Sequence, residues 1–303
     1  MKQLKPSLAV FGGAALWGMV SLFVTPLSRG GLTSMQISLL RVSAAAAVLI
    51  VFALIRDPSV FRFPIRDIWL LMINALLCSV LFNYFYFTTI IRSEASVAAM
   101  LLYTSPIFVI ILSRIIFRES ITPRKVLTLV MTVIGCIFVA GFIGHGGHIP
   151  LIALITGIAT GATYGTFTIV TRLNATRCRP LTVTLYTFLF GTLFMLPFGR
   201  PVETVRLLSS KPSLIPFALF FGPVCSSLAN GLFTWGISRV EAGRAAILAA
   251  SEPLAGALIG MTVWQESRDP IKLVGIVLVL AAIIIQGLDL ARSADSSSGP
   301  DML

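Results

Sequence analysis

The chain has 303 residues, of which 56% are apolar and only 12% are charged. That charged fraction is about half of what soluble domains usually carry, so the composition excludes an ordinary water-soluble protein. The net charge of +11 does not predict nucleic-acid binding, because the basic residues are distributed as membrane topology requires and not as one patch.

Long uncharged stretches predict an all-α membrane protein. A transmembrane helix needs about 20 predominantly apolar residues. In chain order the pattern predicts ten helices, at residues 8–26, 33–55, 68–90, 95–117, 124–143, 150–171, 180–199, 213–238, 243–264 and 270–290. No small-residue cleavage site follows a short apolar run, so we expect the first helix to remain as an anchor.

The basic residues predict the orientation. With both termini in the cytoplasm, the inner segments would carry fifteen Lys and Arg residues and the outer segments seven, with Arg41 inside a helix. An excess of basic residues in cytoplasmic loops is the rule for membrane proteins. We therefore expect a multi-pass protein of the inner (plasma) membrane, and a Ser- and Gly-rich, disordered cytoplasmic tail at residues 293–303.

The chain also contains an internal repeat. Shifting residues 78–125 by 147 positions gives 16 identities in 48 positions, including Arg92 with Arg239 and Glu119 with Glu266. We predict two five-helix repeats, residues 1–147 and 148–292. Because five is odd, the second repeat enters the membrane from the opposite side, and such inverted repeats are typical of secondary transporters with a site near the midplane.

Other features exclude further chemistry. There is no GxxxxGK[ST] motif, so we expect no ATP hydrolysis. Four cysteines without CxxC spacing, and two histidines in a glycine-rich turn at 144–148, predict neither a metal nor a cofactor. A membrane-embedded enzyme would need clustered catalytic groups within the helices, and a receptor would need a soluble region; both remain alternatives to a transporter.

Several short motifs resemble those of one family. They are Gly12-Gly13-Ala14-Ala15-Leu16-Trp17-Gly18, Leu39-Leu40-Arg41, Ser251-Glu252-Pro253-Leu254 with Trp264-Gln265-Glu266, and their counterparts Ser105-Pro106-Ile107 and Phe117-Arg118-Glu119. Over roughly residues 8–290 the chain is similar to EamA-type members of the drug/metabolite transporter superfamily. The resemblance implies a ten-helix fold that moves small metabolites, often outward. Arg118 and Gln265 depart from the usual small residue before the glutamate.

Polar residues inside the predicted helices are candidates for substrate contact, because they are costly in lipid. Ser79, Asn83 and Tyr86 share one face of the third helix, and Asn230 occupies the position of Asn83 in the second repeat. An amide can both donate and accept hydrogen bonds. The alternative is that these residues only join neighbouring helices.

Prolines and one acid mark the fourth and ninth helices. Pro106 and Pro253 cannot bond the carbonyls of Leu102 and Ala249, which predicts kinks with free acceptors that could act as hinges. Glu252, beside the second proline, could carry a proton, bind an amine or pair with Arg41. Glutamates near helix ends, such as Glu119, are expected to cap helices and pair with loops.

Aromatic residues complete the predicted site: Trp17, Tyr103, Tyr164 and Trp235 could stack on a substrate. Together these residues predict transport of amino acids or similar amphipathic solutes, outward and by alternating access, with protons as a possible coupling ion. Export of drug-like cations or other metabolites is the alternative. A monomer and a homodimer are both compatible with the sequence.

Overall fold

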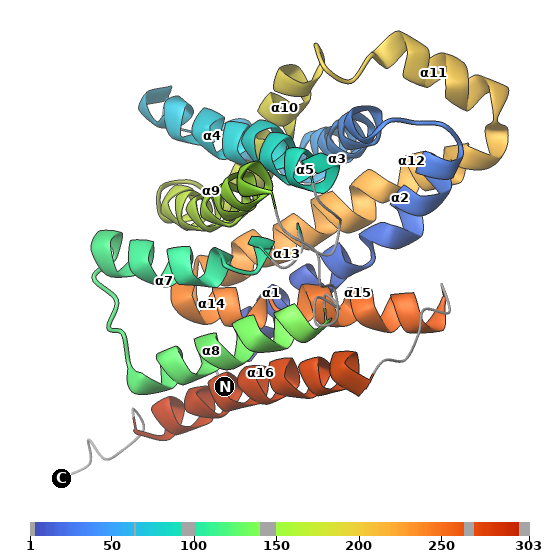
Figure 1. Ribbon diagram of the computed structural model, residues 1–303. Coiled ribbons are helices and arrows are strands. Elements are labelled where there is room, and N and C mark those ends of the chain that lie inside the picture. The colour runs from blue at the N-terminus through green and yellow to red at the C-terminus, as the bar shows by residue number, and fades with distance from the viewer. Residues whose placement is uncertain are drawn as a thin grey trace.

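The computed structural model describes residues 4–63, 65–92, 98, 101–139, 150–263 and 270–296. Within these ranges every regular element is a helix, and the helices pack into one bundle (Figure 1). This agrees with the predicted all-helical class. The histidine-containing turn, Glu94 and Glu266 lie outside the described residues.

The bundle is built from two successions of helices. The first contains α1 (Leu4–Gly18), α2 (Val20–Arg29), α3 (Ser34–Arg56), η1 (Pro58–Phe61), η2 (Ile65–Asp67), α4 (Ile68–Ala75), η3 (Leu76–Leu81), α5 (Phe82–Arg92), α7 (Ser105–Ile116) and α8 (Pro123–Val139). The second contains α9 (Leu151–Arg177), α10 (Pro180–Met195), α11 (Pro201–Ser210), η4 (Pro212–Leu214), α12 (Ile215–Gly222), η5 (Pro223–Leu228), α13 (Ala229–Ile237), α14 (Ala242–Leu248), α15 (Ser251–Thr262) and α16 (Pro270–Ser296).

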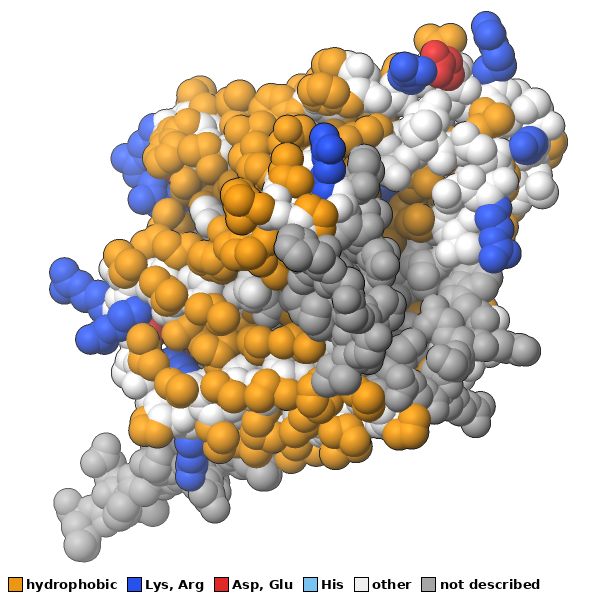
Figure 2. Space-filling model, in the orientation of Figure 1, with side chains coloured by type: hydrophobic (Ala, Val, Ile, Leu, Met, Phe, Trp, Pro, Cys, Tyr) orange, Lys and Arg blue, Asp and Glu red, His pale blue; other side chains and the backbone are white. Residues whose placement is uncertain are grey.

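Length and surface chemistry both fit a membrane. Five helical segments are long and apolar enough to cross a bilayer: Leu4–Arg29, Ser34–Arg56, Ile65–Thr89, Leu151–Arg177 and Pro212–Ile237. Shorter apolar helices lie at Ser105–Ile116, Pro180–Met195 and Leu273–Ile285. Figure 2 shows apolar side chains over most of the described face, and most Lys and Arg side chains at its left and upper right edges. The total of ten spans stays a prediction.

The helices are interrupted at places that the charge spacing did not predict. The first predicted span breaks at Met19, between α1 and α2, and the ninth breaks at Ala249 and Ala250, between α14 and α15. The third and eighth contain π-helical segments, η3 and η5, whose bounds are 147 positions apart, from 76 to 223. Irregular backbone of this kind is tolerated in a membrane where it is buried or lines a cavity.

Close helix crossings hold the broken segments in place. A Cβ added at Gly18 of α1 would lie 2.4 Å from the backbone oxygen of Glu252, and one at Gly165 of α9 would lie 3.1 Å from that of Ser105. These two glycines are repeat mates, and so are the two residues that they contact. Only glycine permits this approach. The backbone beside Glu252 is therefore fixed by contact with α1.

Buried polar groups also join the helices. Asn74 of α4 donates to Thr187 of α10 (2.8 Å) and accepts from Thr171 of α9 (2.9 Å). At the end of α9, Arg177 forms an ion pair with Asp67 of η2 (2.9 Å). At the C-terminus α16 continues to Ser296, so the helix extends into the segment predicted to be a disordered tail; residues 297–303 lie outside the described residues.

Candidate functional site

A cavity of about 870 Å³ lies between the two successions of helices. It reaches from Glu252, at the start of α15, to Thr33 and Ser34, where α3 begins. Its wall is mostly apolar and aromatic, with a few polar groups, as is usual for small-molecule sites. One end of the cavity thus lies where α3 begins, and the other lies at the break between α14 and α15.

Most of the candidate residues line this cavity. They are Trp17, Asn83, Tyr86, Tyr164, Asn230 and Glu252, contributed by α1, α5, α9, α13 and α15. Residues from both repeats therefore meet in one place. Whether they contact substrate stays a prediction.

Three candidates lie elsewhere. Ser79 is fully buried against α10, where a Cβ on Gly191 would lie 2.4 Å from its hydroxyl. Trp235 is partly exposed and stacks under the guanidinium of Arg239, at 4.5 Å. Tyr103 lines a smaller, separate chamber described below. Sequence periodicity shows which residues share a helix face, but it does not show which face a neighbouring helix leaves uncovered. This explains why three of the candidates do not line the cavity.

Glu252 is surrounded by aromatic rings. The hydroxyl of Tyr164 lies 3.5 Å from its carboxylate. The ring of Tyr164 is 6.3 Å from that of Trp17 and 5.8 Å from that of Phe82, which stacks on Tyr86 at 5.5 Å. A carboxylate beside aromatic faces offers both charge and π-electrons to a positively charged group. This arrangement is suited to a protonated amine.

A smaller chamber of about 30 Å³ lies behind Glu252, which lines both spaces together with Tyr164. Tyr103, Pro106 and Thr132 also line it. The hydroxyl of Thr132 is buried and has no hydrogen-bond partner. The chamber is large enough for water. Glu252 therefore lines both the large cavity and this smaller, mostly apolar chamber.

The two prolines lie just after helix breaks and not within continuous helices. Pro106 is the second residue of α7, and Pro253 is the third residue of α15. The prediction that the carbonyl of Ala249 is a free acceptor was wrong, because this carbonyl accepts a hydrogen bond from the backbone N–H of Glu252 (3.0 Å). A tight turn at the break permits this shorter bond. The prolines thus start new helices, where a missing N–H costs little.

The two asparagines differ in their hydrogen bonds. The amide of Asn83 donates to the backbone oxygen of Ser79 within its own helix (2.5 Å). Neither asparagine bonds another helix in the described part of the chain, which disfavours a role as interhelical glue. Such a role belongs instead to Asn74, which the sequence did not single out.

The cavity also contains polar residues that were not among the candidates. Ser34, Ser38 and Arg41 follow one face of α3 at positions i, i+4 and i+7, a spacing that could have identified them. Ser226 of η5 takes the place of its repeat mate Ser79 in the wall. Among the described ion pairs none joins Arg41 to Glu252, so the pairing that the sequence left open as one of three alternatives for Glu252 is not formed.

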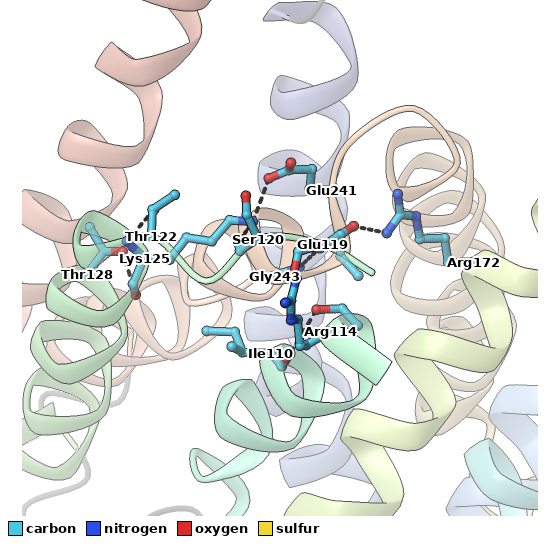
Figure 3. A network of polar contacts seen from close by, with 12 residues as sticks. Ile110, Arg114, Glu119, Ser120, Thr122, Lys125, Thr128, Arg172, Glu241 and Gly243 are labelled. Carbon is cyan, nitrogen blue, oxygen red and sulfur yellow. Dashed lines mark hydrogen bonds and ion pairs between the residues drawn. The ribbon is translucent and has the colours of Figure 1, made fainter. Parts of the chain in front are cut away.

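A polar network around the loop after α7 joins α8, α9 and α14 (Figure 3). Glu119, after α7, forms an ion pair with Arg172 of α9 and accepts from the backbone N–H groups of Ala242 (3.1 Å) and Gly243 (3.4 Å). It thereby caps α14, as expected of a glutamate near a helix end. Burial would raise the pKa of Glu119, but Arg172 and these N–H groups hold the pKa below its usual value.

A second pair extends this network. Lys125, near the start of α8, binds Glu241 at 2.8 Å and donates to the backbone oxygen of Ser120 at 3.0 Å (Figure 3). Glu241 immediately precedes α14. The two acids together tie α8, α9, α14 and the loop after α7, so this end of the bundle cannot open unless ion pairs break.

Curated relatives of this chain are named as transporters. The uncharacterized inner membrane transporter YicL of Salmonella typhimurium is 25% identical over 299 residues, covering 96% of this chain and 97% of its own. The uncharacterized transporter YetK of Bacillus subtilis is 23% identical over 297 residues, covering 93% and 85%. One solved crystal structure superposes with a TM-score of 0.76 at 18% identity and covers 96% of this chain and 99% of its own; it shows the fold alone.

The profile of the EamA-like transporter family matches the chain twice, over residues 4–141 and 151–287. This confirms the family resemblance predicted from the short motifs. The apolar helices and the relatives named as transporters indicate a multi-pass membrane protein that transports, not an enzyme. The chain belongs to the EamA-like transporter family.

Proposed function

We propose that this protein is a secondary transporter that exports amino acids or similar amphipathic solutes across the cytoplasmic membrane by alternating access. One observation carries the proposal: a cavity extends from one end of the bundle to Glu252, and the Glu119–Arg172 network closes the opposite end. A cavity with one open and one closed end is what one state of such a transporter requires. Without a nucleotide-binding motif, the energy comes from a solute or proton gradient.

The proposed topology has ten spans in two inverted repeats, 1–147 and 148–292, with both termini in the cytoplasm. The equal spacing of η3 and η5 supports the repeat. The closed end carries many of the basic residues, among them Arg114, Arg124, Arg172, Arg177 and Arg179. An excess of basic residues marks the cytoplasmic side. The cavity then opens outward.

In this proposal Glu252 binds the amino group of the solute, or a proton when the solute is absent. Trp17, Tyr86 and Tyr164 stack on its apolar part, and Asn83 and Asn230 provide polar contacts. Tyr103 belongs to the chamber behind Glu252. Ser79 and Trp235 are left out because they lie away from the cavity.

The repeat suggests how the opposite end closes. In the sequence, the repeat mates of Glu119, Lys125 and Glu241 are Glu266, Lys272 and Glu94, respectively, each 147 positions away. In this proposal Pro106 and Pro253 lie at the hinges.

Counterflow in proteoliposomes tests this proposal. Vesicles loaded with a pool of unlabelled amino acids should accumulate those labelled amino acids that the protein carries. Glu252→Gln should abolish this exchange, whereas Glu203→Gln, an exposed glutamate of α11, should leave it unchanged. Equal exchange in the wild type and Glu252→Gln would refute the role of Glu252.

Export of drug-like cations is a second candidate. The aromatic rings around Glu252 favour it, because aromatic faces and one carboxylate also bind lipophilic cations. Accumulation of a labelled quaternary ammonium compound, with no exchange of amino acids, would select this function instead.

A further inference from the structure

We infer that Arg41 forms, with Ser226 and Asn230, a binding site for a carboxylate of the transported solute. This inference rests on the proposed function and names its substrate class. The solute carries a carboxylate that Arg41 binds, an amino group that Glu252 binds, and an apolar side chain that lies against the aromatic wall. Such a solute is an amino acid with an apolar side chain, not a lipophilic cation.

The first argument is the unpaired charge of Arg41. It is half-buried on α3 and lines the cavity, with its guanidinium 5.8 Å from the ring centre of Phe221. No described residue forms a hydrogen bond or an ion pair with the Arg41 guanidinium. Charged side chains within membrane helices are costly and are normally paired or face a functional cavity. An arginine without a carboxylate partner is therefore ready for one from the solute.

The second argument is the neighbouring wall. Phe221, Ser226 and Asn230 follow one another along α12, η5 and α13, and all three line the cavity with Arg41. η5 packs against α3. The hydroxyl of Ser226 is buried without a partner, and no described residue forms a hydrogen bond with the amide of Asn230, which is 8% exposed. Because both residues line the cavity, their polar groups are available to donate to a carboxylate of the solute.

The third argument is the separation of the two charges. Arg41 and Glu252 line the same cavity but form no ion pair, and aromatic side chains, among them Phe82 and Tyr164, lie in the same wall. A guanidinium binds a carboxylate through two parallel hydrogen bonds, which gives it preference for planar anions. The arrangement therefore selects solutes that carry both a carboxylate and an amino group.

Binding to the purified full-length protein tests the inference, with thermal unfolding as the measurement. Three matched pools serve as probes at about pH 6.5: leucine, methionine and phenylalanine; their three amides, which lack the carboxylate; and 4-methylpentanoate, 4-(methylthio)butanoate and 3-phenylpropanoate, which lack the amine. The variants are Arg41→Gln and Arg41→Lys, with Arg239→Gln as a matched control at the exposed cation–π pair.

We expect the amino acids to stabilise the wild type most, the carboxylates less and the amides least. Arg41→Gln should weaken amino-acid binding about 10- to 100-fold, the range for losing a hydrogen bond to a charged group. Arg41→Lys should give an intermediate loss, because it keeps the charge but not the two parallel bonds. Arg239→Gln should bind as the wild type does.

Two results would overturn the inference. One is that amides stabilise the wild type as well as amino acids do, or that none of the pools stabilises it. The other is that Arg41→Gln, with an unfolding temperature like that of the wild type, keeps its affinity. Glu252-dependent counterflow of amino acids, together with either result, would leave the proposed function standing while removing the carboxylate site; counterflow of a cation alone would select the second candidate function.

Discussion

The inner network yields a quantitative prediction for Glu119→Gln. The substitution keeps the size of the side chain but removes its charge. Its carboxylate accepts from Arg172 and from the backbone N–H groups of Ala242 and Gly243, and only 8% of the Glu119 side chain is exposed. All three donors are aimed at the carboxylate, so a neutral amide, which has only one accepting oxygen, cannot satisfy all of them.

The expected loss follows from these bonds. A hydrogen bond to a charged group contributes about 1.5–3 kcal/mol and a neutral one about 1 kcal/mol. Glutamine still accepts at one oxygen, and Arg172, whose side chain is 18% exposed, can turn toward water. We therefore expect a loss of about 2 kcal/mol in the closure of this end. That loss corresponds to a population of the open form roughly 30-fold larger.

Hydrogen–deuterium exchange measures this opening directly. The backbone N–H groups of Ala242 and Gly243 should exchange about 30-fold faster in Glu119→Gln, resolved from overlapping peptides that cover the start of α14. Glu203→Gln is the matched control, because Glu203 belongs to an exposed pair with Arg200 at 3.4 Å. Its exchange at α14 should equal that of the wild type.

An unchanged rate would refute the reasoning. If exchange at α14 rises less than about twofold in Glu119→Gln, the carboxylate does not hold this end closed, and closure rests on apolar packing. A faster rate spread over all helices would instead indicate general destabilisation. Exchange within α3 and α10, which do not contact Glu119, separates these two outcomes.

Three further predictions follow from other contacts. Gly18→Val should lower the free energy of unfolding by about 1–3 kcal/mol and weaken binding at Glu252, because a Cβ at Gly18 would lie 2.4 Å from the backbone oxygen of Glu252. Gly12→Val is the control: nothing lies within 4 Å of a Cβ at Gly12, so this variant should unfold like the wild type. Asn74→Ala should cost about 1 kcal/mol, from two interhelical bonds of about 0.6 kcal/mol each, measurable as reversible unfolding in mixed micelles. The pKa of Glu119 is lowered below its usual 4.5, so the contribution of its carboxylate to closure is complete above pH 4.5 and is lost as the pH falls through the lowered pKa. Hydrogen exchange at α14, corrected for intrinsic rates, should therefore stay slow at about pH 5 and rise only in stronger acid.

The sequence predicted the helical class, the family and six of the residues that line the cavity. These features depend on local information: the length of apolar stretches, the rarity of polar groups in lipid, and identities between two repeats. Glu252 could be singled out for that reason, since no other carboxylate lies as deep in a predicted helix. The same rarity marked Arg41, but as a partner of Glu252 and not as a separate group.

Only the tertiary structure decided which polar residues meet. Ser79 and Ser226 are repeat mates, yet one packs against Gly191 and the other lines the cavity, because neighbouring helices cover the two faces differently. The break at Met19 was likewise invisible, since hydropathy does not record whether a span is continuous. Residue type and spacing determine which groups must leave the lipid, whereas the packing of helices determines whether they face a partner, a wall or a cavity.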